Sequence, residues 1–315
     1  MTEFELIARY FSRPNRSALL GNGDDCAIIA PSAGNAFAVT TDTLIEGRHF
    51  LPTLDPFKLG RRVVNVNLSD LAAMGAQPRY ALLSLTLPQI DEAWISRFSD
   101  GLWSALDAYS VELIGGNTTQ GPLAIALTAF GELPPAAALK RSGARVGDEL
   151  WVSGALGDAG WAMHALTTAQ CKATPEQIAK YECPEARVSL GLALRGIATS
   201  CIDISDGLLS EAKHIATASN ISIDIDIAAI PTGLESGLLD AFGQHCLLST
   251  GDAYELLFTA PRDQHAAVAA ILQRENLPGA CIGRVTALDV AHRVRLLDAQ
   301  ARVMDIEVKG WDHFA

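Results

Sequence analysis

Acidic side chains with small or hydroxyl-bearing neighbours recur in five segments of this sequence. Each segment also adjoins a run of apolar residues that would form a strand or a helix. The segments are GNGDDCAII, VTTDTLIEGRHF, NLSDLAAMG, LIGGNTTQG and CIDISDGLLSE, with the candidate residues Asp24, Asp25, Asp42, Asp70, Asn117, Asp203 and Asp206. Small neighbours allow a ligand to approach the backbone closely. The Thr and Ser hydroxyls add neutral oxygen atoms to the possible ligands.

These residue types favour a site for a hard divalent cation. Ligand sets made only of oxygen suit Mg²⁺ or Ca²⁺ and not zinc. Carboxylates that converge repel one another unless a cation lies between them. Because bound Mg²⁺ usually takes phosphate oxygens as its other ligands, the five segments indicate a metal site that also binds phosphates.

A purely structural interpretation competes with this one for each segment. An acidic residue before an apolar run is most often a helix N-cap or a turn residue. Asp70 and Asp206 fit helix caps, and Asp24 and Asp25 fit a turn after Gly23. For any single segment the structural interpretation is the better one, so only the recurrence of five segments favours a shared site.

Several other kinds of site are excluded by the sequence. It contains no G-x-x-x-x-G-K-[ST] loop, and ISDGLLSE lacks the spacing of an EF-hand loop. It also contains no H-E-x-x-H, no G-x-S-x-G and no protein-kinase signature set. The six cysteines form no C-x-x-C pair, so neither a zinc site nor a redox motif is indicated.

Length, charge and hydropathy set further bounds on the class of protein. The 315 residues suffice for about two domains, at roughly 150 residues each. The net charge of −12 argues against binding to nucleic acid or to an anionic membrane, although Mg²⁺ would still allow phosphate ligands. The first residues are too charged for a signal peptide, and no apolar run reaches the roughly 18 residues of a membrane helix. We expect a cytoplasmic protein.

The hydrophobic spacing predicts strands and helices in both halves of the chain. Helices are expected over residues 56–75, 91–109, 184–198, 207–219 and 261–275. Strands are expected over 37–41, 80–88, 123–133, 149–154, 201–205, 221–227, 254–260 and 281–285, with a strand and then a turn in VELIGG. The Pro-, Gly- and Ala-rich stretch 134–148 is interpreted as a domain connection. The fold class is therefore α/β (α+β), with mixed domains over 1–139 and 140–315.

Seven segments together resemble the thiamine-monophosphate kinase family. In chain order they are GDDCA, TTDTLIEGRHF, NLSDLAAMGAQP, LIGGNTT, LKRSGARVGD, IDISDGL and KGWDHF. The third and sixth are shared, in looser form, with the wider superfamily of aminoimidazole-ribonucleotide synthetase-like enzymes, whereas the second and last are more specific. The resemblance implies two mixed α/β domains with the active site in the cleft between them, and a homodimer formed through the N-terminal domains. It also implies ATP-dependent phosphorylation of thiamine monophosphate to thiamine diphosphate.

The resemblance further implies roles for individual residues. Several Mg²⁺ ions would be held by Asp25, Thr40, Thr41, Asp42, Asp70, Asn117, Asp203 and Asp206. ATP would be contacted by Gly116, Asn117, Arg141 and Ser205, and thiamine monophosphate by His49, Asp252 and Trp311. The acceptor is a phosphate oxygen that is largely ionised near neutral pH. We therefore expect no general base, no phosphoenzyme and no other catalytic side chain.

Two positions depart from the pattern of this family. Asn117 replaces an aspartate, so it offers a carbonyl oxygen without the charge. In TGDAYEL, Asp252 replaces a glutamate and Ala253 replaces an aspartate. The first change predicts weaker Mg²⁺ binding at one position, and the second affects the contacts to thiamine monophosphate.

Two other functions compete with the kinase. One is another ATP-using synthetase of the same superfamily, which the segments TDTLIEGRHF and KGWDHF disfavour. The other is a non-enzymatic protein whose acidic segments bind structural ions. Arg141 argues against that possibility, because a structural metal site has no use for a cation. Separate structural interpretations also exist for Arg141 as a solvated cation, for Trp311 as a packing residue and for His49 as a structural histidine.

Overall fold

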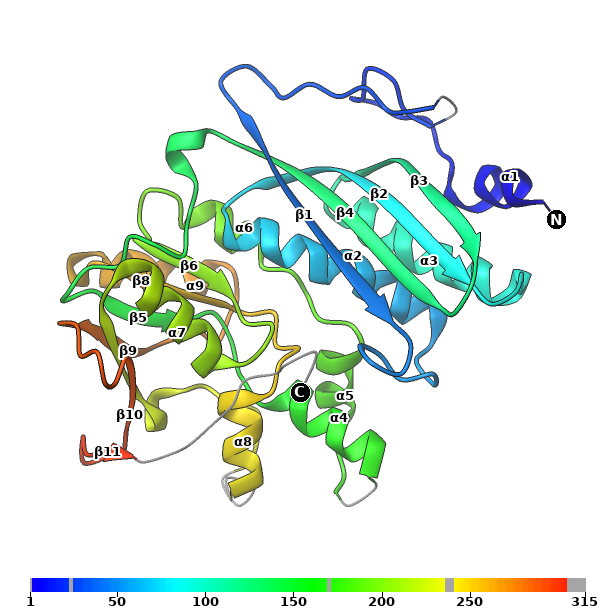
Figure 1. Cartoon of the computed structure of the whole chain (residues 1–315). Coiled ribbons are helices and arrows are strands. Elements are labelled where there is room, and N and C mark those ends of the chain that lie inside the picture. Colours follow the sequence, from blue (N-terminus) through cyan, green and yellow to red (C-terminus); the bar gives the residue numbers. More distant parts are fainter. Residues whose placement is uncertain (1, 23–24, 169–170, 236–240, 305–315) are drawn as a thin grey trace. The chain divides into compact units, whose positions relative to one another are not determined.

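The structure of the chain, a computed structural model, describes residues 2–22, 25–168, 171–235 and 241–304. The chain folds into two compact units, each with its own sheet (Figure 1). Unit 1 comprises Met1–Leu71 and Ala76–Ala136, and unit 2 comprises Ala72–Gly75 and Ala137–Ala315. Mixed helices and sheets in both units confirm the predicted α/β (α+β) class. None of the helices in the described ranges is long and apolar enough to cross a membrane.

Unit 1 consists of a four-stranded sheet, two long helices and short helical turns. Its elements are α1 (Glu3–Leu6), the π-helical turn η1 (Ile7–Phe11), β1 (Ala36–Ile45), α2 (Pro56–Ala73), β2 (Gln77–Leu87), α3 (Glu92–Ala108), β3 (Glu112–Gln120), β4 (Ala124–Leu133) and the 3₁₀ turn η2 (Pro135–Ala137). The strand order is β1-β4-β2-β3, with β2 and β3 parallel and the other pairs antiparallel.

Helices α2 and α3 cover one face of this sheet (Figure 1). The two helices pack closely because glycines replace side chains at their contact. A Cβ atom on Gly60 would lie 2.2 Å from the Phe98 carbonyl oxygen, and one on Gly101 would lie 1.9 Å from the Phe57 carbonyl oxygen. The side chains of β1 alternate between the two faces, so Leu44 is buried against the helices and its neighbours point the other way.

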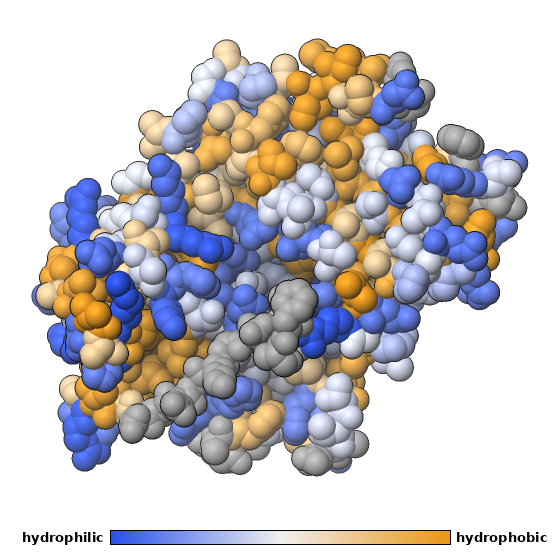
Figure 2. Space-filling view, viewed as in Figure 1, coloured by the Kyte–Doolittle hydropathy of each residue, from blue (hydrophilic) through white to orange (hydrophobic). Residues whose placement is uncertain are grey.

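The other face of the sheet in unit 1 carries exposed apolar and hydroxyl side chains. Val39 is 58 % exposed and Ile45 is 43 % exposed, and Thr41 and Thr43 lie between them on the same face of β1. Figure 2 shows hydrophobic residues gathered over this part of the surface.

Most predicted elements of unit 1 form, with two corrections. The helices expected over 56–75 and 91–109 are α2 and α3, and Asp91 caps α3 by accepting the backbone N–H groups of Ala93 and Trp94. The turn predicted within VELIGG is wrong, because β3 continues to Gln120. The interpretation of Asp70 as a helix cap is also wrong, because Asp70 lies in the last turn of α2.

Unit 2 contains a seven-stranded sheet with helices around it. Its elements are β5 (Glu149–Val152), α4 (Asp158–Thr168), α5 (Pro175–Glu182), α6 (Val188–Ala193), β6 (Ser200–Asp203), α7 (Leu208–Ser219), β7 (Ser222–Asp226), η3 (Ile227–Ala229), α8 (Ala241–Ser249), β8 (Leu256–Ala260), η5 (Arg262–Gln264), α9 (His265–Arg274), β9 (Ala280–Thr286), β10 (Val294–Leu297) and β11 (Val303–Met304). The strand order is β11-β10-β7-β9-β5-β8-β6, and within the described part of this sheet only β7 and β10 pair in parallel. The helix predicted over 184–198 is shorter than expected, because α6 covers only Val188–Ala193.

The main core of unit 2 lies between α7 and one face of this sheet. Leu208, Ala212 and Ile215 of α7 pack with buried strand residues such as Ile202 and Ile223. On β5 and β8, the rings of Trp151 and Phe258 are stacked, and His265 of α9 contacts Trp151 at a ring distance of 4.9 Å. Because successive side chains of a strand point to opposite faces, both faces of this sheet carry packed side chains.

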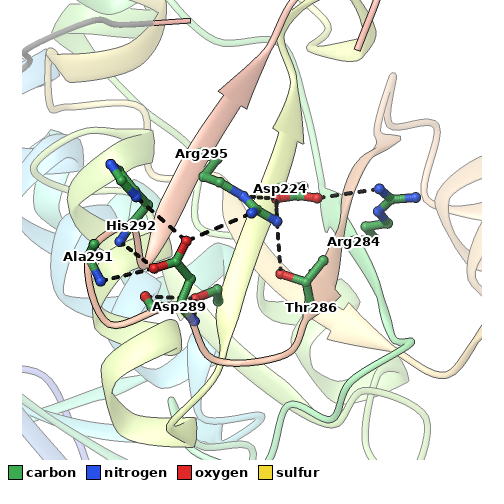
Figure 3. Close-up of polar contacts among 8 residues, drawn as sticks. Asp224, Arg284, Thr286, Asp289, Ala291, His292 and Arg295 are labelled. Atoms are coloured by element: carbon green, nitrogen blue, oxygen red, sulfur yellow. Dashed lines mark hydrogen bonds and ion pairs between the residues drawn. The ribbon is translucent and has the colours of Figure 1, made fainter. Parts of the chain in front are cut away.

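A polar network occupies the strands β7, β9 and β10 (Figure 3). The Asp224 carboxylate is buried and accepts from Arg295 Nε at 2.7 Å, and its other oxygen lies 3.4 Å from Arg284 Nη2. Arg295 also lies 4.0 Å from the Asp289 carboxylate, whose second oxygen accepts the backbone N–H groups of Ala291 and His292. This network pairs the buried charge of Asp224 within the strands.

Candidate active site

Three oxygen-bearing side chains of unit 1 lie on one face of the sheet, between β1 and α2. Thr40 and Asp42 are two residues apart on β1, so both point towards the helices. The Thr40 hydroxyl donates a hydrogen bond to Asp70 Oδ2. The Asp42 backbone N–H donates to Asn67 Oδ1 at 2.9 Å, and Asn67 Nδ2 donates to the Val63 carbonyl at 2.8 Å. The buried Asn67 therefore ties α2 to β1 beside the predicted ligands.

The position of Asp70 on α2 is one that the helix dipole makes less favourable for a negative charge. Asp70 lies three residues before the C-terminal end of the helix, where the helix dipole disfavours negative charge. The carboxylate of Asp42 belongs to the same face of β1, which adds a second negative charge. A cation bound here would offset both effects.

Thr41 is not brought together with these residues. Its hydroxyl points to the opposite face of the sheet, where it donates to the Leu127 carbonyl at 3.2 Å and accepts from the Thr128 hydroxyl at 3.0 Å. The side chain of Thr41 thus bonds to β4 and lies on the opposite face of the sheet from Asp70.

Gly116 and Asn117 lie within β3, next to β2. Asn117 is exposed and pairs in register with Ser84. Gly116 has a φ of 156°, and a Cβ atom there would lie 1.9 Å from the Leu83 carbonyl oxygen. Only glycine fits this close approach between the two strands.

His49 and Asp25 lie on the segments that flank β1. His49 is half-buried in the turn after β1, and its Nδ1 accepts the Ile45 backbone N–H at 3.0 Å. Asp25 is exposed in a bend. Three residues before it in the sequence, Asn22 Nδ2 donates to the Leu113 carbonyl of β3 at 3.2 Å.

Unit 2 brings together its predicted residues on two adjoining segments. The first runs from Asp203 at the end of β6 to Asp206, and the second precedes β8. The backbone N–H of Asp252 donates to the Ser205 carbonyl at 2.9 Å, and that of Tyr254 donates to the Ile204 carbonyl at 2.8 Å. These bonds extend the pairing of β6 with β8, so Asp203, Ser205 and Asp206 lie beside Asp252.

Glu211 is an acidic residue of this site that the sequence analysis did not select. It is 2 % exposed, and its Oε1 accepts the Asp206 backbone N–H at 3.1 Å. Its Oε2 is buried and has no hydrogen-bond partner in the described part of the chain. Burial raises the pKa of Glu211 to about 8, and the carboxylates of Asp206 and Asp203 contribute to this increase.

Of the remaining predicted residues, the structure describes Arg141, which lies near the start of unit 2. Arg141 is exposed, and its carbonyl accepts from the Ser219 hydroxyl at 3.3 Å. The carbonyl of the preceding residue, Lys140, accepts the Cys201 backbone N–H at 2.8 Å, so this segment runs beside β6. Asp206 does not cap α7, whose N-cap is Gly207. Trp311 and Asp24 lie outside the described residues.

The acidic side chains that the structure describes do not form a complete metal site by themselves. Within the described ranges, no group of three or more His, Cys, Asp or Glu side chains could hold a metal ion. Any ion bound at these carboxylates would therefore complete its ligand sphere with hydroxyl, amide or phosphate oxygens.

Comparison with known proteins places this arrangement in a family. The family model for the AIR synthase related protein N-terminal domain matches residues 23–133, and the model for the C-terminal domain matches residues 145–294. The thiamine-monophosphate kinase of Escherichia coli strain K12 is 43 % identical over an alignment 328 positions long, which covers 99 % of this chain and 98 % of that protein. The chain belongs to the thiamine-monophosphate kinase family of AIR synthase related proteins.

Solved structures of thiamine-monophosphate kinases share the fold of this chain. The crystal structure of the kinase from Stenotrophomonas maltophilia K279a has a TM-score of 0.83 at 38 % identity, covering 93 % of this chain and 94 % of that one. The structure of AaThiL complexed with AMPPCP and TMP has a TM-score of 0.76 at 30 % identity, covering 90 % and 89 % of the two chains.

Three residues of this thiamine-monophosphate kinase homologue were missed by the sequence analysis. Asn67 lies three residues before the selected Asp70 on α2, and this spacing is a usable signal because residues three and four apart on a helix are neighbours. Glu211 lies in the first turn of α7, five residues after Asp206, where no such spacing identifies it. Tyr254, whose hydroxyl donates to Asp252 Oδ1 at 3.3 Å, carries no such signal.

Proposed function

We propose that this chain transfers the γ-phosphoryl group of ATP to the phosphate of thiamine monophosphate, giving thiamine diphosphate and ADP. The observation that carries the proposal is the match, over 99 % of the chain, to proteins named thiamine-monophosphate kinase. A relative solved with AMPPCP and TMP supports the same pair of substrates. The arrangement of acidic residues described above is consistent with binding two phosphorylated ligands through cations.

The proposed metal ligands are Asp25, Thr40, Asp42, Asp70, Asn117, Asp203 and Asp206, whereas the side chain of Thr41 lies on the opposite face of the sheet. The hydroxyl of Thr40 and the carboxylates of Asp42 and Asp70 offer oxygen atoms as ligands, which fits Mg²⁺. In unit 2, Glu211 has a buried oxygen without a hydrogen-bond partner in the described chain, which a metal-bound water would satisfy. Of the two threonines, only Thr40 directs its hydroxyl towards Asp70. Bound Mg²⁺ would supply neutralisation of the phosphate charges.

The chain's own residues would bind and orient the two phosphorylated molecules. Gly116, Asn117, Arg141 and Ser205 would contact ATP, and Arg141 offers a planar fork of donors for phosphate oxygens. His49 and Asp252 would contact thiamine monophosphate, together with Trp311, which lies outside the described residues.

The reaction needs positioning more than proton transfer. A bond forms between an oxygen of the acceptor phosphate and the γ-phosphorus, and the bond from the γ-phosphorus to the bridging oxygen breaks. The electron pair of that broken bond leaves with ADP. Because the attacking oxygen is already ionised, no general base is required, and the direct in-line transfer forms no phosphoenzyme.

We also propose that the chain forms a homodimer through the exposed face of the sheet in unit 1. Val39 and Ile45 present apolar side chains on this face, and the neighbouring threonines are uncharged (Figure 2). A sheet face without a helix cover and without charge on β1 would gain from burial against a second copy.

The decisive experiment is incubation of the protein with ATP, Mg²⁺ and thiamine monophosphate, followed by chromatography for thiamine diphosphate. Formation of thiamine diphosphate only when all three are present supports the proposal. Thermal shift with each component alone gives a second readout, because a ligand that binds the folded state raises Tm. Stabilisation by Mg²⁺ alone, without a response to nucleotide or thiamine monophosphate, would instead indicate a protein that binds structural ions.

A further inference from the structure

A buried ion pair lies directly beside the segment that carries Asp252. Glu255 is 1 % exposed, and its carboxylate accepts two hydrogen bonds from the guanidinium of Arg187. Nε donates to Oε2 at 2.8 Å, and Nη2 donates to Oε1. The Ser153 hydroxyl also donates to Oε2, and Lys180 Nζ lies 3.7 Å from Oε1. The pair joins residues 68 positions apart in the sequence. Gly154 makes room for it, since a Cβ atom there would lie 2.5 Å from the Glu255 carboxylate.

The segment next to this pair has a strained backbone. Asp252 has a φ of 65° and Tyr254 has a φ of 49°, both in the left-handed region that side chains other than glycine disfavour. Residues in such conformations persist only where their surroundings determine them, and they cluster at functional sites.

Contacts at both ends hold the strained segment. At its start, Gly251 packs so tightly that a Cβ atom would lie 2.0 Å from the Ser205 carbonyl oxygen. At its end, the Glu255 carbonyl accepts the Ile204 backbone N–H at 2.8 Å, and the Glu255 side chain is fixed by Arg187. Within the segment, the Tyr254 hydroxyl donates to Asp252 Oδ1 at 3.3 Å, so the orientation of the Asp252 side chain depends on the same stretch of chain that Glu255 anchors.

We propose that Arg187 and Glu255 are positioning residues for thiamine monophosphate, acting through the strained segment that presents Asp252. The inference rests on the proposed function, in which Asp252 contacts that substrate. Arg187 would touch neither substrate. Its planar fork fixes Glu255 in one orientation, and lysine, with a single point of charge, cannot replace this geometry. Loss of the guanidinium group of Arg187 would lower the affinity for thiamine monophosphate more than the affinity for ATP.

The experiment compares Arg187→Lys with a matched control, Arg295→Lys. Arg295 also forms a two-pronged pair with a buried carboxylate of unit 2, Asp224, but on strands that carry none of the predicted site residues (Figure 3). Both variants keep the positive charge and lose the planar guanidinium group that donates two hydrogen bonds. For each, KM for thiamine monophosphate, KM for ATP and Tm are measured on the full chain with Mg²⁺.

We expect Arg187→Lys to raise KM for thiamine monophosphate by roughly 10- to 100-fold, the scale expected for a displaced binding group, with KM for ATP within about twofold of wild type. Arg295→Lys lowers Tm to a similar degree and leaves both KM values unchanged. A second variant, Glu255→Gln, keeps the side-chain shape and is expected to show the same selective rise in KM.

Several outcomes would overturn the inference. They are an unchanged KM for thiamine monophosphate, an equal rise in both KM values, the same rise in Arg295→Lys, or loss of the cooperative unfolding transition in both Arg187→Lys and Glu255→Gln. The last result would show that the pair supports unit 2 as a whole. If the wild-type protein itself makes no thiamine diphosphate, the proposed function fails, which is a result separate from any of these.

Discussion

The hydroxyl of Thr40 on β1 donates a hydrogen bond to the carboxylate of Asp70 on α2. These residues are 30 positions apart in the sequence, and the bond joins the sheet of unit 1 to the last turn of its longest helix. Because the carboxylate is placed where the helix dipole disfavours it, this contact identifies the position at which we expect Mg²⁺ to bind in unit 1.

Thr40→Val tests this contact with nearly the same side-chain volume. The variant removes the donor that orients the Asp70 carboxylate, so the concentration of Mg²⁺ that gives half-maximal activity is expected to rise by roughly 10-fold. Thr43→Val, on the same strand but on the exposed face, is the control and should leave that concentration unchanged. Equal Mg²⁺ dependence in the two variants would contradict a role for Thr40 in metal binding.

Asn117→Asp tests the departure from the family pattern in β3. The substitution restores a charged oxygen ligand, so activity should reach half its maximum at a several-fold lower Mg²⁺ concentration. Asn117 is exposed, and Tm without ligands should therefore change little. The prediction is refuted if a titration of activity against Mg²⁺ is identical for the variant and the wild type.

Asp158 in the first turn of α4 is expected to lower stability as pH rises. Burial raises the pKa of Asp158 above its ordinary value of 3.8, although Gln177 Nε2 donates to its carboxylate at 3.2 Å. Between the ordinary and the raised pKa, the folded state binds more protons than the unfolded state. The contribution of Asp158 to the free energy of unfolding is therefore fully present below its pKa in the unfolded state. It is lost as pH rises through the higher pKa that Asp158 has in the folded state.

Asp158→Asn removes this pH dependence and keeps an acceptor for Gln177. The variant should have a higher free energy of unfolding than wild type at neutral pH, and the difference should shrink as pH falls towards the ordinary pKa. Urea unfolding at a series of pH values measures both effects. Asp263→Asn, at an exposed position, is the control. A difference that stays constant with pH would show that titration of Asp158 is not its cause.

Val39→Glu tests the proposed dimer. Val39 is exposed in the single chain, so a charge there should not impede folding of unit 1, but it would be buried without a partner in a dimer. We expect sedimentation equilibrium to give a dimer for wild type and a monomer for the variant. Val290→Glu introduces the same charge at an exposed position of unit 2 and should remain dimeric. A wild-type protein that sediments as a monomer would disprove the dimer directly.

The sequence determined the elements whose signals are local. Apolar residues at steps of three and four, with Asp91 as a cap and proline and glycine at the ends, predicted α2 and α3 to within a few residues. The recurring aspartates with small neighbours also selected Asp42, Asp70, Asp203 and Asp206, because oxygen ligands for a hard cation are evident from residue type alone. The segments that resemble a known family added the substrates.

Only the tertiary structure decided which side chains share a face and which long-range pairs form. The extension of β3 through Gly116 depends on pairing with β2, which no local signal encodes. The separation of Thr41 from Thr40 depends on which face of β1 the helices cover, and the pairing of Arg187 with Glu255 joins distant segments. Hydrogen bonds and burial between remote residues arise only when the chain is folded, so residue types and spacing along the sequence cannot specify them.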